Sequence, residues 1–282
     1  MSKIRAYKLV NCTKAEHEQI AKFNSFYKLS THDVFRKIEQ HACGCCYGGN
    51  SWTTKEQAEY IGQKLDLSSK SSLIDLGAGA GWPGLYLSSM SGCSLTLVDL
   101  PETGLKIAEE RSIKDKISRR VKTLVADASE LPFLDQSFDA VSHSDLLCCL
   151  FLKEKVLTEC RRVIRAHGKM VFTVISITPG LSKLDYEKAI ANSPEFIRVD
   201  EEYSKILERC GWKIVDRVDL SKDYLETCRL QIEADELYCD KLIELLGEKQ
   251  TTDRIGNWQS KLEVIGEGLV KRELYVCLPN KS

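Results

Sequence analysis

Hydrophobic and polar positions follow two different periods along this chain of 282 residues. Before about residue 66 the apolar side chains recur at helical spacing, as Ile20, Phe23 and Phe26 do. From residue 72 onward, short apolar runs alternate with amphipathic segments, which predicts strands separated by helices. This alternation is typical of a parallel sheet with helices on both faces. We therefore expect an α/β fold built on a doubly wound, seven-stranded and mostly parallel sheet.

The expected elements are placed by their apolar runs and by the glycine, proline and capping residues between them. Thr54 and Gln57 form a capping-box pattern, and Gly168 is expected to end the helix that begins at Lys153. Strands are predicted at 73–75, 95–99, 121–125, 137–143, 169–176, 212–220 and 273–278. Helices are predicted at 12–27, 31–39, 54–65, 102–114, 153–165, 181–190, 199–210, 224–246 and 258–265.

We interpret residues 1–282 as one domain with three parts. Residues 1–66 form a helical lid, residues 72–180 a ligand-binding core, and residues 181–282 the substrate side. About fifty residues separate the last two predicted strands, and a connection of that length is often functional. We expect this connection, at about 221–268, to be a helical cap.

The stretch from Ser72 to Gly84 carries the clearest chemical signal. A short apolar run ends at Asp75, glycines follow at alternate positions, and Pro83 suits the first turn of a helix. This order predicts a tight turn at the carboxyl end of the sheet, where nucleotide-like ligands bind. Two ligands compete for such a turn. Residues 79–84 read as the dinucleotide motif GxGxxG, whereas an acid followed by one residue and GxGxG suits S-adenosylmethionine, which has no phosphate to cradle.

Two more acids follow predicted strands. Asp99 lies 22 residues after Gly77, and an acid at this place accepts hydrogen bonds from ribose hydroxyls. This position suits either cofactor, but Asp127 and Ala128 after the third strand favour the adenosyl group. The carboxylate would accept from the adenine amine, and the next backbone N–H would donate to the ring. The alternative is that Asp127 only caps the turn after the strand.

At this point the chain resembles class I S-adenosylmethionine-dependent methyltransferases, in the branch of the ubiquinone/menaquinone, sterol and phosphoethanolamine methyltransferases. The resemblance covers residues 72–176 and rests on motifs that stand in family order: 73–81 (LIDLGAGAG), Val98-Asp99, 126–133 (ADASELPF), 135–141 (DQSFDAV) and 162–165 (RVIR). One departure is Ala166-His167-Gly168, where the branch has Pro-Gly-Gly. The resemblance implies a Rossmann-like fold, S-adenosylmethionine as cofactor and S-adenosylhomocysteine as product.

The resemblance also implies roles for individual residues. His143, at the tip of the fourth strand, is the candidate general base for an acceptor that must lose a proton; the alternative is that His143 only packs or bonds to backbone. No metal ligands are expected. The cofactor-binding residues would be Asp75, Gly77, Ala78, Gly79, Gly81, Asp99, Leu100, Asp127, Ala128 and Ser144.

The acceptor is expected to be a small molecule enclosed by lid and cap. Aromatic residues there would line its pocket, cage an ammonium group or simply pack: Phe26, Tyr27, Tyr47, Trp52 and Trp82. The C-terminal layout, with Trp258 and a final strand bearing Tyr275, resembles phosphoethanolamine methyltransferases. That family uses a Tyr–His pair near the methyl group. The matching histidine position here is Cys149, so the pair is not reproduced.

The chain has 12 cysteines, scattered without the spacing of a small secreted scaffold. We expect most to be thiols that pack as small apolar residues. An alternative is an arsenite methyltransferase whose lid and strand-tip thiols bind the substrate. The thiols concerned would be Cys43, Cys45, Cys46, Cys148 and Cys149.

Composition narrows the remaining choices. A net charge of −1 without a dense Lys/Arg block argues against nucleic-acid binding. No apolar run approaches the ~20 residues of a membrane span, and the first residues lack a signal core, so we expect a cytoplasmic protein without a membrane span. The alternatives are a protein or RNA methyltransferase, a non-catalytic cofactor-binding subunit, and a nicotinamide oxidoreductase.

Overall fold

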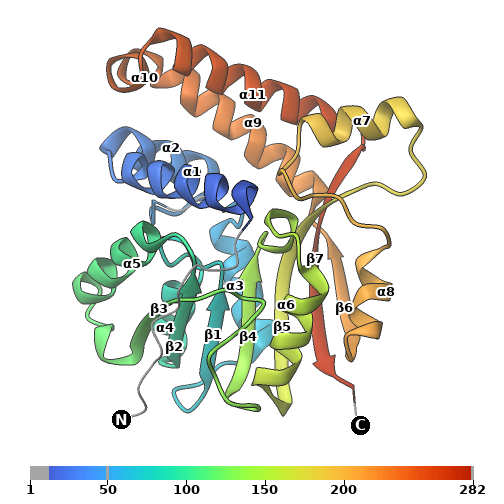
Figure 1. Cartoon of the computed structure of the whole chain (residues 1–282). Coiled ribbons are helices and arrows are strands. Elements are labelled where there is room, and N and C mark those ends of the chain that lie inside the picture. Colours follow the sequence, from blue (N-terminus) through green and yellow to red (C-terminus); the bar gives the residue numbers. More distant parts are fainter. Residues whose placement is uncertain (1–12, 49–50, 281–282) are drawn as a thin grey trace.

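The structure, a computed structural model, describes residues 13–48 and 51–280. Seven strands form one sheet in the order β3-β2-β1-β4-β5-β7-β6, and only β7 runs antiparallel to its neighbours (Figure 1). This arrangement confirms the predicted α/β fold with a mostly parallel sheet. The strands are β1 (Ser72–Leu76), β2 (Ser94–Asp99), β3 (Val121–Val125), β4 (Phe138–Ser144), β5 (Ile164–Ile177), β6 (Trp212–Asp219) and β7 (Val270–Pro279).

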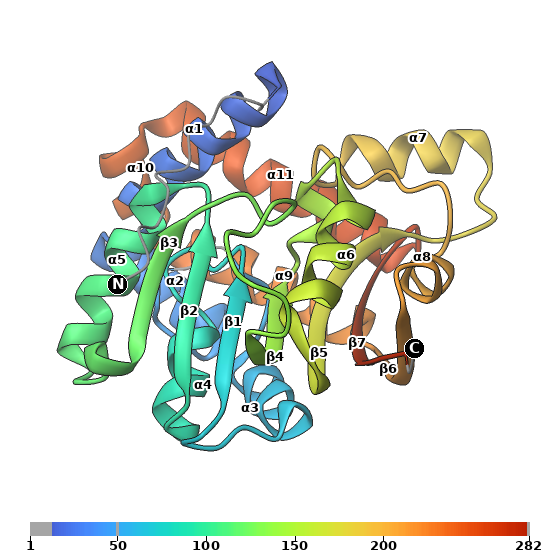
Figure 2. The ribbon, with the colours of Figure 1, turned by 60° about the horizontal axis from the view of Figure 1, so that its bottom comes forward.

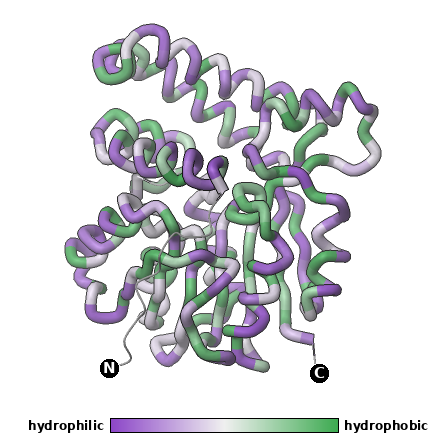
Figure 3. Tube along the Cα trace, in the orientation of Figure 1, coloured by the Kyte–Doolittle hydropathy of each residue, from purple (hydrophilic) through white to green (hydrophobic). Residues whose placement is uncertain are grey.

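Helices cover both faces of the sheet because neighbouring strand residues point to opposite sides. In β1, Leu73 packs with one apolar cluster and Ile74 with the other. The first cluster includes residues of α3 (Lys55–Leu65), α4 (Gly84–Ser91) and α5 (Glu102–Lys114). The second includes residues of α6 (Lys153–Val163) and α8 (Tyr203–Arg209). Along these helices hydrophobic and hydrophilic residues alternate (Figure 3), as expected for elements with one buried side.

Two further groups of helices lie over the carboxyl edge of the parallel strands (Figures 1 and 2). The first group is α1 (Lys14–Ser30) and α2 (Asp33–Cys43), which we call the lid. The second is α9 (Ser221–Leu237), α10 (Cys239–Leu246) and α11 (Glu248–Gly266), which we call the cap. Lid and cap share an apolar cluster that joins Phe35 and Ile38 to Ala234 and Leu242. A separate helix, α7 (Lys183–Ala191), lies beside the cap at the end of β5.

Most predicted boundaries agree with the structure, including the Thr54–Gln57 capping box of α3. The predicted start of the first helix at Cys12 lies outside the described residues. The expected end of α6 at Gly168 is wrong, because α6 ends at Val163 and β5 begins at once with Ile164. Gly168 lies inside β5, where an added Cβ would come within 2.6 Å of the Asp139 carbonyl oxygen. The glycine therefore permits close strand approach and does not end the helix.

In the part of the chain that the structure describes, we find no helix whose length and apolar character would let it cross a membrane.

Candidate active site

The glycine turn after β1 is built on left-handed backbone. Gly77, Gly79 and Gly81 have φ values of 63°, 50° and 92°, a region that residues with a Cβ avoid. The turn is also crowded. A Cβ on Gly77 would lie 2.6 Å from Leu146 Cδ1, and a Cβ on Gly79 would lie 2.4 Å from the Tyr27 hydroxyl. Both glycines are therefore required by backbone conformation and by space.

Asp75 lies beneath this turn, with only 1% of its surface exposed. Its Oδ1 accepts a hydrogen bond from the Ser142 hydroxyl at 2.7 Å. A Cβ added to Gly84 would lie only 2.5 Å from the Oδ2 of Asp75. Burial raises the pKa of Asp75 to about 7, and the hydrogen bond from Ser142 and the nearby Gly84 backbone oppose that rise only in part. Asp75 thus supports the turn and the start of α4 from below.

This raised pKa makes a testable contribution to stability. Asp75 binds its proton more tightly in the folded protein than in the unfolded chain, so its contribution is lost as the pH rises through about 7. Between pH 6 and pH 8 the wild type should lose about 1.4 kcal/mol of unfolding free energy that Asp75→Asn does not lose. Urea unfolding of both proteins at the two pH values measures this difference. Equal losses of unfolding free energy in both proteins would contradict the raised pKa of Asp75.

Asp99 connects the end of β2 to the glycine turn. Its Oδ2 accepts from the Gly79 N–H at 2.7 Å and its Oδ1 from the Leu100 N–H at 2.8 Å. Burial raises the pKa of Asp99 to about 6, although both backbone N–H groups favour the charged form. Each carboxylate oxygen has a second acceptor position, so these bonds are compatible with a hydroxyl ligand.

The tip of β3 lies beside the tip of β2, since the Ala126 N–H donates to the Asp99 carbonyl at 3.2 Å. Asp127 is half-buried, and its Oδ1 accepts from the Ser129 N–H at 2.7 Å. That bond is the turn cap that the sequence offered as the alternative role of Asp127. Ala128, the next residue, is buried. The contacts of Asp127 and Ala128 to adenine stay a prediction.

The structure puts His143 in an unexpected environment for a general base. Its side chain is fully buried, stacks on Phe172 with a ring separation of 4.5 Å, and leaves both ring nitrogens without a hydrogen-bond partner. Burial lowers its pKa to about 3. Because strand side chains alternate, Ser142 faces Asp75 while His143 points into the opposite apolar layer. This placement favours the packing role, and only Ser144 at the strand end remains half-exposed.

The aromatic residues expected around the acceptor do not form one cage. Tyr47 packs on Trp82 at 4.8 Å, and Trp52 packs on Trp258 at 5.2 Å, so they belong to separate groups. Tyr27 is 5% exposed and lies on the glycine turn against Gly79. Burial, together with the charges of Asp99 and Cys149, raises the pKa of Tyr27 well above its usual value. Its phenol therefore stays protonated beside the turn.

The thiols that would bind arsenite do not gather at one point. Cys43 Sγ donates to the Ser51 carbonyl and Cys148 Sγ donates to the Asp145 carbonyl. Burial, with the nearby charge of Glu39, raises the pKa of Cys43 to about 12, which disfavours the thiolate that a soft ion needs. Within residues 13–48 and 51–280, no group of three His, Cys, Asp or Glu side chains is arranged to hold a metal ion. The structure therefore argues against this alternative.

Sequence reasoning missed three further charged residues of this region: Asp145 and Arg272, which form an ion pair, and Lys261, which lies over the rings of Trp52 and Trp258. Asp145 directly follows β4 and Asp99 is the last residue of β2, so the rule that found Asp99 would also have found Asp145. Arg272 comes from β7 and Lys261 from α11. Neither lies in a motif, and the only local signal is that Lys261 stands three residues after Trp258 on one side of a helix.

Comparison with known proteins agrees with this geometry. Residues 74–172 match the family described as methyltransferase domain. Methyltransferase GfsG of Streptomyces halstedii is 24% identical, and the match covers 77% of this chain and 78% of that protein. Phosphoethanolamine N-methyltransferase 1 of Zea mays is 23% identical over 81% of this chain, which spans only 44% of the maize protein.

Among solved structures, Haemonchus contortus phosphoethanolamine N-methyltransferase 2 with phosphomonomethylethanolamine and S-adenosylhomocysteine has a similar fold. The TM-score is 0.74 at 20% identity, and the match covers 92% of this chain and 60% of the other. The sheet order, the glycine turn and the strand-end acids of this chain thus agree with the fold of that methyltransferase. Within this fold, residues 74–172 are the part that matches the methyltransferase domain family.

Proposed function

We propose that this protein transfers a methyl group from S-adenosylmethionine to a small molecule that carries a phosphate or carboxylate group. The observation that carries the proposal is Lys261, a cation on the inner side of the cap. Its Nζ lies 5.8 Å from the Trp52 ring centre and 5.6 Å from that of Trp258. Among the described residues, no carboxylate lies within ion-pair distance of Lys261.

The surroundings of Lys261 connect it to the cofactor side of the site. Burial lowers the pKa of Lys261, and the nearby Cys228, Cys148 and Cys149 oppose that effect. Cys149 also influences the pKa of Tyr27, which lies on the glycine turn. A half-buried ammonium group without an acidic partner is costly unless an anion joins it. We therefore place the anionic group of the acceptor at Lys261 and its reacting end near Tyr27.

Other charges near the strand tips fit the same proposal. The Asp145 carboxylate is already paired with Arg272, with Nε at 3.0 Å and 3.1 Å from its two oxygens. The charge of Asp145 is thus balanced by Arg272, whereas Lys261 has no ion-pair partner among the described residues. The names of two similar proteins add support, because phosphoethanolamine and phosphomonomethylethanolamine both carry a phosphate group.

The proposed cofactor site fits the group it would hold. The turn offers three residues without a Cβ, Gly77, Gly79 and Gly81, and Asp99 offers a half-buried carboxylate at the strand end. When bound, S-adenosylmethionine supplies an electrophilic methyl group, and the protein has to hold the acceptor in line with it. Asp99 and Asp127 would bind the adenosyl part, Tyr27 would position the acceptor by donating from its phenol, and Lys261 would anchor the far end.

The experiment is a label-partition assay with a lysine variant. Wild type, Lys261→Met and Lys249→Met are incubated with methyl-labelled S-adenosylmethionine and host extract, and small molecules, lipids, protein and RNA are then separated. We expect label in small anionic molecules, reduced about 10- to 100-fold by Lys261→Met because a charge-assisted bond is lost. Lys249→Met changes an exposed lysine at the start of the same helix and should leave labelling unchanged.

Each other outcome has a definite meaning. Label in protein or RNA would contradict the small-molecule acceptor. Label in a neutral or cationic small molecule, or full activity of Lys261→Met, would contradict the anion site at Lys261 but leave methyl transfer intact.

A further inference from the structure

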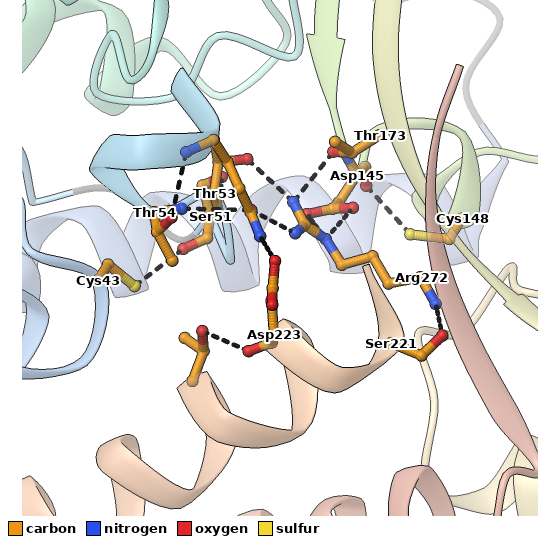
Figure 4. A network of polar contacts seen from close by, with 12 residues as sticks. Cys43, Ser51, Thr53, Thr54, Asp145, Cys148, Thr173, Ser221, Asp223 and Arg272 are labelled. Carbon is orange, nitrogen blue, oxygen red and sulfur yellow. Dashed lines mark hydrogen bonds and ion pairs between the residues drawn. The ribbon is translucent and has the colours of Figure 1, made fainter. Parts of the chain in front are cut away.

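Arg272 stands at the centre of a buried polar network that has no assigned role in the proposed reaction (Figure 4). We infer that Arg272 is a positioning residue of the methyl-transfer site, acting through Asp145 and Thr53 on the two segments that hold the glycine turn. The inference rests on the proposed placement of the cofactor at that turn. It concerns a residue from β7, the strand that runs against the others.

The guanidinium of Arg272 bonds to four side chains and has no exposed surface. Its Nε donates to both oxygens of Asp145, at 3.0 Å and 3.1 Å, and its Nη1 donates to Gln57 Oε1 at 2.8 Å. Its Nη2 donates to the hydroxyls of Thr53, at 3.0 Å, and Thr173, at 3.1 Å. These partners come from the end of β4, from within β5 and from the start of α3, so one side chain bonds to three elements.

The first connection runs from Arg272 through Asp145 to Gly77. Asp145 has a left-handed backbone with φ of 53°, which a residue with a Cβ keeps only when its surroundings enforce it. Its N–H donates to the Thr173 carbonyl at 3.0 Å, and its own carbonyl accepts from Cys148 Sγ at 3.1 Å. The next residue, Leu146, packs directly on Gly77. The bond to Arg272 therefore holds the backbone that presses Leu146 onto the glycine turn.

The second connection runs through Thr53 to the other end of the turn. The carbonyl oxygen of Thr53 accepts from Trp82 Nε1 at 2.7 Å, and Trp82 directly follows Gly81. Gln57 extends the same network to the cap, because its Nε2 donates to Asp223 of α9 at 3.0 Å. Arg272 thus joins both ends of the glycine turn and the cap helix to one buried group.

This arrangement goes beyond what stability requires. A buried ion pair often contributes little net stability, because desolvation offsets the attraction between the charges. The two connections end on Gly77 and Trp82, which flank the backbone proposed to hold the methionine part of the cofactor. A shift of about 1 Å at such a place can cost about a hundredfold in rate. Loss of Arg272 should therefore disturb the methionine end of the site more than the adenosyl end, which Asp99 and Asp127 would hold.

The test compares two cofactor analogues by isothermal titration calorimetry. S-adenosylhomocysteine has the amino-acid part, whereas 5′-methylthioadenosine lacks it. We expect Arg272→Met to weaken S-adenosylhomocysteine about tenfold or more while 5′-methylthioadenosine stays within about twofold. Arg254→Met is the matched control. It removes another ion pair with a buried carboxylate, Arg254–Asp235 at 2.6 Å, which belongs to the cap, and it should leave both affinities unchanged.

A double variant and a conservative one keep the test decisive. Because Arg272 acts through both Asp145 and Thr53, Asp145→Asn should show a smaller loss with the same selectivity, and Arg272→Met combined with Asp145→Asn should be no worse than Arg272→Met alone. Arg272→Lys keeps the charge and should recover part of the affinity for S-adenosylhomocysteine. It replaces Arg272→Met in the test if that variant does not fold. Equal weakening of both analogues, or none, would overturn the positioning role. A wild type that binds neither analogue would overturn the proposed cofactor site itself.

Discussion

Gly79→Ala is expected to weaken binding of S-adenosylhomocysteine about 100-fold or more, because the new methyl group has no space. The position is left-handed, with φ of 50°, and an added Cβ would lie 2.4 Å from the Tyr27 hydroxyl and 3.0 Å from its Cζ. Tyr27 cannot simply retreat, since it is buried and stacked on Phe23. Either the turn or the lid must therefore move. Isothermal titration calorimetry of the purified variant measures the loss.

The chain offers a matched control for this change. Gly256 lies in α11, and a Cβ added there would meet no atom within 4 Å. Gly256→Ala should leave cofactor affinity unchanged and slightly stabilise the helix, because alanine is the better helix former. If Gly79→Ala bound within about threefold of the wild type, the close contact between lid and turn would not exist in solution.

The fold could be predicted largely from the sequence because its signals are local. Strand periodicity, the capping box at Thr54 and the acids after β2 and β3 each depend on a few neighbouring residues. Gly168 misled the prediction because two structures need a glycine there for different reasons. A helix end and a close contact between strands both favour glycine. Only the position of the Asp139 carbonyl in the folded chain shows which of the two applies at Gly168.

The site was predicted less completely because its parts come from distant segments. The backbone turn and Asp99 lie in two motifs only about 20 residues apart, so the sequence could propose them together. Arg272, by contrast, lies 127 residues from Asp145 and 219 from Thr53. His143 shows the opposite case, since it has the right residue type at a strand tip but points to the apolar side of the sheet, which favours its packing role. Direction along a strand changes with every residue, so an error of one position reverses the role.

Asp99→Ala is expected to weaken binding of S-adenosylhomocysteine by about 1.5–3 kcal/mol, or about 10- to 150-fold. Two effects combine. The change removes the carboxylate proposed to bind the ribose, and it leaves the Gly79 and Leu100 N–H groups without their acceptor. The wild type should also bind more weakly below about pH 6, where Asp99 takes up a proton. Asp99→Asn should not show this dependence, because its amide does not titrate.

Asp139→Ala separates this role from a general effect of removing a buried acid. Asp139 also accepts from a backbone N–H, that of Ser72 at 2.8 Å, but it lies at the opposite end of the sheet. Hydrogen bonds from Ser72 and Arg165 lower the pKa of Asp139 to about 2 despite partial burial. Asp139→Ala should therefore reduce the melting temperature while cofactor affinity stays unchanged. Equal loss of affinity in both variants would mean that Asp99 acts through stability alone, and unchanged affinity in Asp99→Ala would remove it from the cofactor site.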